Sequence, residues 1–188
     1  MANTNNEKRA AQFITEATKR KANASARERL WIEALNDFYH GKLKGAERKR
    51  QYVRQLEKIV HEFPDDIEAK AFLVGTIWGN SNYGPAASRI AISSHEAVDA
   101  LAAQVLAAHP DHPVHHYRIH LWDEEKAARA LNSAALGGPA APTIAHMWHM
   151  PGHTYSKLKR YADAAWQQEA SSRVDHVHMF HDHVLPDQ

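Results

Sequence analysis

Two pairs of histidines with the same internal spacing stand one repeat length apart in this sequence. His116 and His120 form the first H-x-x-x-H pair, and His149 and His153 form the second, 33 residues later. Residues four apart share one face of a helix, so each pair can present two imidazoles in one direction. A spacing of 33 residues is close to the length of a repeat built from two helices. Equivalent helices of neighbouring repeats would then direct four imidazoles toward one point. Several imidazoles that converge in this way can bind a metal ion.

Two further donors lie near the pairs. Asp123 follows His120 by one helical turn, and His146 precedes His149 by one turn. A set of imidazoles with one carboxylate suits zinc, copper, nickel or non-haem iron, and the sequence does not choose among them. Six donors also leave a two-metal site open. The predicted ligands are therefore His116, His120, His149, His153, Asp123 and His146.

The pairs also have a plainer interpretation, because duplication of a repeat can copy a packing role as easily as a ligand. Of the 15 histidines, 12 lie between His109 and His183. We expect His115 to face solvent, and His109 and His112 to make hydrogen bonds in a proline turn. The C-terminal group is either a second metal feature or the start of a further repeat, and it comprises His176, His178, His181 and His183.

Composition limits the class of protein. The 188 residues are 44% hydrophobic and 24% charged, which predicts one globular domain over residues 1–188. No apolar run is long enough to span a bilayer. The absence of cysteine excludes disulfides and thiolate ligands, and it leaves the compartment open. The abrupt end suggests a piece of a longer protein.

The charges are unevenly spread, but no sequence motif supports a nucleic-acid partner. Residues 1–63 carry 14 Lys and Arg against 8 Asp and Glu, and the rest of the chain is acidic. A solvated helical surface explains this asymmetry, because no phosphate-binding loop or ribonucleoprotein motif accompanies it. The zinc-protease motif H-E-x-x-H is also absent.

The apolar residues repeat with the helical period throughout the chain. Ser25 is expected to cap the second helix, Asp66 the fourth and Asp123 the helix that follows it. Pro64, Pro110 and Pro139 are expected between helices, because proline cannot donate the helical hydrogen bond. The expected helices span residues 6–21, 26–40, 45–63, 67–79, about 86–108, 113–122, 124–136, a segment that starts at Thr143, and 161 to about 174.

One segment carries a family resemblance. The stretch YSKLKRYADAAWQQEA, residues 155–170, resembles the turn and second helix of the tetratricopeptide repeat. Lys159 stands where that repeat usually has glycine, and Ser171 where it usually has alanine. The motifs HYRIHLWD and HMPGH resemble a histidine-rich bacterial subset of this family. The resemblance covers about residues 25–178 and implies an all-α, tetratricopeptide-like α-solenoid of about four antiparallel helix pairs with a leading helix.

The functional hypothesis joins the fold to the histidines. In such repeats the first helix of each pair lines a concave groove, so the paired histidines would bind a divalent transition metal there. A catalytic metal would keep an open position and activate water or dioxygen, and whether this site is catalytic is left open. The alternative is a metal-free scaffold that binds a peptide or protein in the groove. Metal storage or sensing lies between these two hypotheses.

Overall fold

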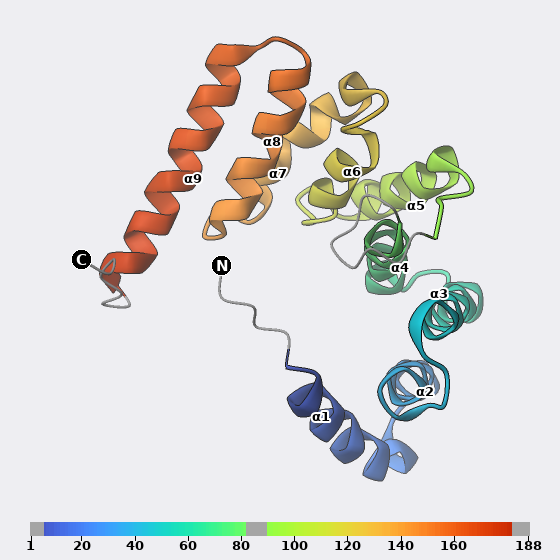
Figure 1. Ribbon diagram of the computed structural model, residues 1–188. Helices are drawn as coiled ribbons and strands as arrows, with labels where there is room; N and C mark the ends of the chain where they lie inside the picture. The colour runs from blue at the N-terminus through green and yellow to red at the C-terminus, as the bar shows by residue number, and fades with distance from the viewer. Residues whose placement is uncertain (1–5, 82–89, 182–188) are drawn as a thin grey trace. The chain divides into compact units, whose positions relative to one another are not determined.

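All regular elements in the described part of the chain are helices. The computed structural model describes residues 6–81 and 90–181, and no strand occurs within these ranges. The chain forms two compact units, residues 1–92 and 93–188, whose helices are drawn in Figure 1. The prediction of an all-α protein is confirmed.

The first unit is a series of helices in which each packs against the next. Ser25 begins the second helix with a capping box, in which its side chain and that of Glu28 each accept from the other's backbone N–H. Asp66 caps the fourth helix by accepting from the Ala69 N–H at 3.0 Å. The helices are α1 (Glu7–Lys19), α2 (Ala26–His40), α3 (Gly45–Glu62) and α4 (Ile67–Asn80), with a 3-10 turn at Lys21–Asn23.

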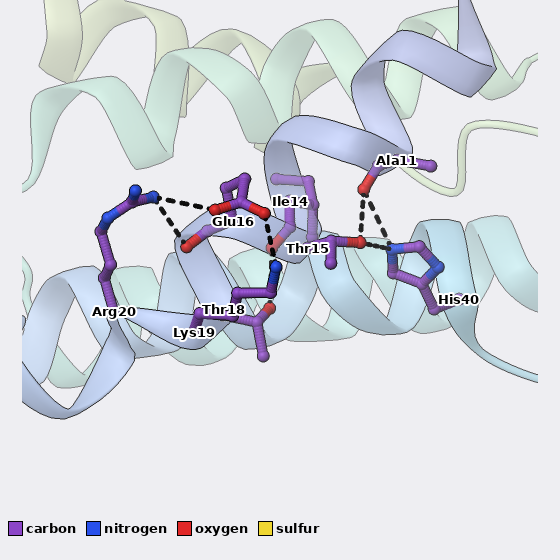
Figure 2. Close-up of polar contacts among 8 residues, drawn as sticks. All are labelled: Ala11, Ile14, Thr15, Glu16, Thr18, Lys19, Arg20 and His40. Carbon is purple, nitrogen blue, oxygen red and sulfur yellow. Dashed lines mark hydrogen bonds and ion pairs between the residues drawn. The ribbon is translucent and has the colours of Figure 1, made fainter.

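Polar contacts join α1 to α2 at the end of α2. The Nε2 atom of His40 lies 3.1 Å from both the Thr15 hydroxyl and the Ala11 carbonyl oxygen (Figure 2). Glu16 on the same helix binds Lys19 at 2.7 Å. These groups are exposed, so their contacts contribute little free energy.

The second unit contains the histidine-rich half of the chain. Neighbouring helices again pack in sequence, and α6 also contacts α8. Helices α8 and α9 run side by side in opposite directions (Figure 1). The elements are α5 (His95–Ala108), α6 (His115–Trp122), a 3-10 helix (Ala127–Ala130), α7 (Leu131–Ala140), α8 (Ala145–Lys157) and α9 (Tyr161–His181).

A buried carboxylate fixes α6 against α5. Asp99 accepts hydrogen bonds from Arg118 Nε at 2.6 Å and from Trp122 Nε1 at 2.9 Å. Burial by itself would raise the pKa of Asp99, but these two hydrogen bonds and the charges of Arg118 and Arg129 outweigh it and lower that pKa. The anchored helix is the one that carries His116 and His120.

Three predicted helix boundaries are wrong. The helix expected from residue 86 begins at His95, because the Ser94 side chain caps it by accepting from the Ala97 N–H; residues 86–89 lie outside the described range. Asp123 does not cap a following helix, since it ends α6 in helical conformation. The helix expected over 124–136 is split into the 3-10 helix and α7.

The predictions for two single residues, Pro139 and His115, are also wrong. Pro139 lies inside the last turn of α7 rather than between helices. The preceding Gly138 packs so closely on the Trp148 ring that a Cβ would overlap it, so this glycine serves helix packing and not a turn. His115 is buried, with Nε2 2.8 Å from the Pro110 carbonyl oxygen and Nδ1 3.1 Å from the Ser133 hydroxyl.

Candidate metal centre

Two helices of the second unit supply the histidines of the candidate site. Helix α6 carries His116 and His120, and α8 carries His146, His149 and His153. The two helices contact one another although α7 separates them in the sequence. They are the first helices of neighbouring pairs, which is the relationship that the 33-residue spacing predicts.

Three imidazoles converge between these helices. His116, His120 and His146 each offer one ring nitrogen, and these three atoms lie within 4.8 Å of one another. The His116 and His146 Nε2 atoms are 3.2 Å apart. Two ligands of a tetrahedral zinc ion with bonds of 2.0–2.1 Å are separated by about 3.3 Å. The His116–His146 separation is thus close to that of two ligands of one metal ion, and we call His116, His120 and His146 the His trio.

Burial keeps the three rings of the His trio uncharged. It lowers the pKa of His116 to about 4, with a smaller contribution from His146. It lowers the pKa of His120 to about 3, with contributions from the surrounding histidines. The pKa of His146 is also lowered, mainly by burial. All three rings are thus neutral at pH 7, and a neutral imidazole is what a metal ion requires.

The other two predicted histidines form a neighbouring pair. The Nε2 atoms of His149 and His153 lie 2.9 Å apart, and the His149 ring stacks on that of His146 with centroids 5.7 Å apart. His146, which the sequence offered as an additional ligand, therefore lies in the trio and also adjoins the pair. Convergence of His116, His120, His149 and His153 on a single point stays a prediction.

Asp123 lies behind the pair rather than within the trio. Its Oδ2 atom is 3.8 Å from His153 Nδ1. Its Oδ1 atom is buried and has no hydrogen-bond partner within the described residues. Burial raises the pKa of this carboxyl, and the charges of His153 and Lys157 partly oppose that shift.

Sequence reasoning missed one residue that holds the site. Gln168 of α9 places its Oε1 atom 2.6 Å from His149 Nδ1 and donates from Nε2 to the His149 carbonyl oxygen at 3.1 Å. It reaches across Gly152, where a Cβ would overlap the Gln168 amide. The glycine of HMPGH was the available signal, because its lack of a side chain marks a close approach.

The remaining histidines have other partners. His112 Nδ1 accepts from the Val114 N–H at 3.0 Å, so the predicted turn hydrogen bond is confirmed for this residue. His178 Nε2 lies 2.7 Å from the Thr143 carbonyl oxygen. Within the described range, no group of three converging donors forms from His176, His178 and His181, and His183 lies outside that range.

The comparisons with known proteins support the fold alone. No protein-family model matches the sequence. No curated protein matches it either. A solved structure named MamA MSR-1 C2, from a protein with tetratricopeptide repeats, is similar over 90% of this chain and 92% of its own, with a TM-score of 0.58 and 15% identity. The chain therefore has an all-α, tetratricopeptide-like solenoid fold.

The last helix pair agrees with the repeat in detail. Helix α8 begins at Ala145, two residues after the start expected at Thr143. Lys159, at the position usually held by glycine, has φ of 60°, the left-handed conformation for which glycine is preferred.

In the described part of the chain, no helix is both long and apolar enough to cross a membrane.

Proposed function

We propose that this chain binds a divalent transition metal ion through the His trio of its tetratricopeptide-like second unit. The observation that supports this proposal best is the convergence of His116, His120 and His146 from two helices, with their donor atoms within 4.8 Å. A packing role would not require three nitrogen atoms to face one another. Three basic nitrogens with lone pairs at this separation favour a cation between them.

The donor set limits which metals are plausible. Imidazole nitrogen suits zinc, copper, nickel and iron, and it suits magnesium or calcium poorly. Three protein ligands leave at least one coordination position for a small molecule, which is the arrangement that catalytic sites retain. Tyr117 lies on α6 with two of the ligands, and Asp123 directly follows that helix, so α6 and its C-cap would supply the polar groups for any activity.

A metal titration tests the proposal. The full chain is stripped of metal with a chelator and titrated with Zn²⁺, Cu²⁺, Ni²⁺ or Fe²⁺ in a calorimeter. The titration with Fe²⁺ is done without oxygen. We expect at least one ion per chain, and we expect the double variant His116→Ala/His146→Ala to lose the ion of the His trio while keeping its helical circular dichroism. The loss should exceed the roughly 10–100-fold that removal of an outer-shell partner costs.

His61 provides the matched control. It is an exposed histidine on α3, so His61→Ala removes one imidazole without touching the trio. We expect this variant to bind as the unaltered chain does. A stripped chain that takes up none of the four ions, or a double variant that binds them normally, would overturn the proposal.

A second candidate is a metal-independent interaction scaffold. It is favoured by the tetratricopeptide-like fold, because such repeats present long surfaces to peptides, and by aromatic side chains that α9 leaves exposed, Trp166 and Phe180. The metal-stripped chain would then bind members of a peptide library. That binding would survive His116→Ala/His146→Ala, whereas binding that needs metal would not.

A further inference from the structure

The His149–His153 pair has its own supporting groups, distinct from those of the trio. Gln168 fixes the orientation of His149. A backbone carbonyl only accepts hydrogen bonds, so the Gln168 amide nitrogen faces the His149 carbonyl oxygen at 3.1 Å and the amide oxygen faces His149 Nδ1 at 2.6 Å. Nδ1 therefore carries the ring hydrogen of His149. Its Nε2 atom is left with a lone pair.

Asp123 lies behind the second ring, at ion-pair distance and without a hydrogen bond to it. Its Oδ2 atom lies 3.8 Å from His153 Nδ1, on the side of the ring opposite Nε2. A carboxylate behind one nitrogen of a histidine orients the other nitrogen toward a metal and increases its basicity. Asp123 reaches this position from α6, and His153 from α8.

The two Nε2 atoms then face one another. Their separation is 2.9 Å, and two adjacent ligands of a five- or six-coordinate ion with bonds of 2.0–2.1 Å are about 2.9 Å apart. In the metal-free chain the His149 Nε2 lone pair can accept a hydrogen bond from His153 Nε2; with the His153 hydrogen on Nδ1 instead, both Nε2 lone pairs face the same point. A cation that replaces the shared hydrogen would be bound by both atoms.

A buried atom without a partner points the same way. Asp123 Oδ1 is buried and accepts no hydrogen bond within the described residues, although a buried carboxylate oxygen ordinarily has a donor. Positive charge added at His149 and His153 would stabilise this carboxylate. The unpartnered atom and the facing nitrogens are independent observations that both favour a cation at the pair.

From these contacts we propose that the His149–His153 pair holds a second divalent transition metal ion, next to the one bound by the His trio. The inference rests on the proposed function, because it makes the same site dinuclear. His146 connects the two centres, since its ring stacks on His149 and its Nε2 atom lies 3.2 Å from that of His116. Gln168 and Asp123 are positioning residues of the second centre.

Metal stoichiometry separates this inference from the proposed function. Equilibrium dialysis of the full, metal-stripped chain against Zn²⁺, with elemental analysis, should give two ions per chain. His153→Ala should retain one ion, His116→Ala should retain one, and His61→Ala should retain two. Asp123→Asn should weaken only one of the two ions, by roughly 10–100-fold.

Copper adds a readout that depends on the distance between the ions. Two Cu²⁺ ions in adjacent centres couple magnetically, so the electron paramagnetic resonance spectrum should differ from the sum of the His153→Ala and His116→Ala spectra. One ion per chain with His153→Ala unchanged would overturn the second centre and leave the proposed function standing. One ion that both variants lose would show a single shared centre, and no ion at all would overturn both proposals.

Discussion

The Nε2 atoms of His116 and His146 lie 3.2 Å apart although 30 residues separate them in the sequence. The contact exists because α6 and α8 pack together and each directs a polar ring into their shared face. Burial there penalises charge on the rings. The pKa of His116 is about 4 and that of His120 about 3, so the same packing that gathers the nitrogens also keeps their lone pairs available.

These lowered pKa values predict how stability depends on pH. In the unfolded chain both histidines bind protons below a pH of about 6.5, whereas in the folded chain they do so only near pH 4 and 3. The unfolded state therefore binds more protons in this window. The contribution of these two histidines to the free energy of unfolding is complete above pH 6.5 and is lost as the pH falls toward 4 and 3.

Thermal unfolding of the metal-free chain from pH 7.5 to pH 4.5 checks this prediction. We expect the melting temperature to fall with acidification, and to fall less steeply in His116→Asn/His120→Asn. Asp123, whose pKa is raised, stabilises the folded state as the pH falls. Both proteins contain Asp123, so it does not affect the difference between them. An equal slope in the two proteins would contradict the prediction.

The lowered pKa values also predict that the His trio still binds metal below a pH of about 6.5, where isolated histidines would be protonated.

The Gln168 contact predicts the ring tautomer of His149. Gln168→Met removes the acceptor at His149 Nδ1, so the hydrogen is free to move to Nε2. Gly152→Ala should do the same, because its Cβ would displace the Gln168 amide. The ¹⁵N imidazole shifts of the metal-free chain measure the tautomer. Gln168→Glu is the matched control, since it keeps an acceptor oxygen at Nδ1 and should leave the shifts of Nδ1 and Nε2 in the same order.

The sequence predicts the helices that form the site better than it predicts how each helix is rotated. The H-x-x-x-H spacing indicates one face of α6 and one of α8, and the repeat length indicates that these helices meet. Neither spacing determines the rotation of α8 about its axis. That rotation depends on packing, including the contact between Gly138 and the Trp148 ring, and it places His146 beside His116 and His120.

Other parts of the site have no local pattern in the sequence. Gln168 lies 19 residues from His149, and no periodicity connects the two. His115 follows the same principle, because its burial depends on Pro110 and Ser133 from other segments. Pro139 was expected to end a helix, but near a C-terminus the hydrogen bond it cannot donate is one of the last, and the helix tolerates it.

The turn between α8 and α9 offers a stabilising substitution. Lys159 has φ of 60°, a conformation that costs an ordinary residue roughly 1–2 kcal/mol. Lys159→Gly removes this strain but adds entropy to the unfolded chain, so we expect a net gain of about 0.5–1 kcal/mol in the free energy of unfolding. Urea denaturation measures it. Lys157→Gly, in the regular end of α8, should instead be neutral or destabilising by up to about 1 kcal/mol.

The Asp99 network predicts the largest loss of stability. Asp99→Ala leaves the Arg118 guanidinium and the buried Trp122 Nε1 without the carboxylate that now lies 2.6 and 2.9 Å from them. Removing one partner of a buried ion pair costs about 3–5 kcal/mol. Because both donors belong to α6, we also expect weaker metal binding by the His trio.

Glu169→Ala is the matched control, because the Glu169–Arg173 pair is exposed on α9. An exposed pair of this kind contributes about 0.3–0.5 kcal/mol, and metal binding should not change. Urea denaturation and metal titration of both variants separate the two cases. If Asp99→Ala were no more destabilising than Glu169→Ala, the contacts of Asp99 would not be what holds α6 in place. The position of His116 and His120 would then depend on the apolar packing of Ile119 and Trp122, both of which are buried.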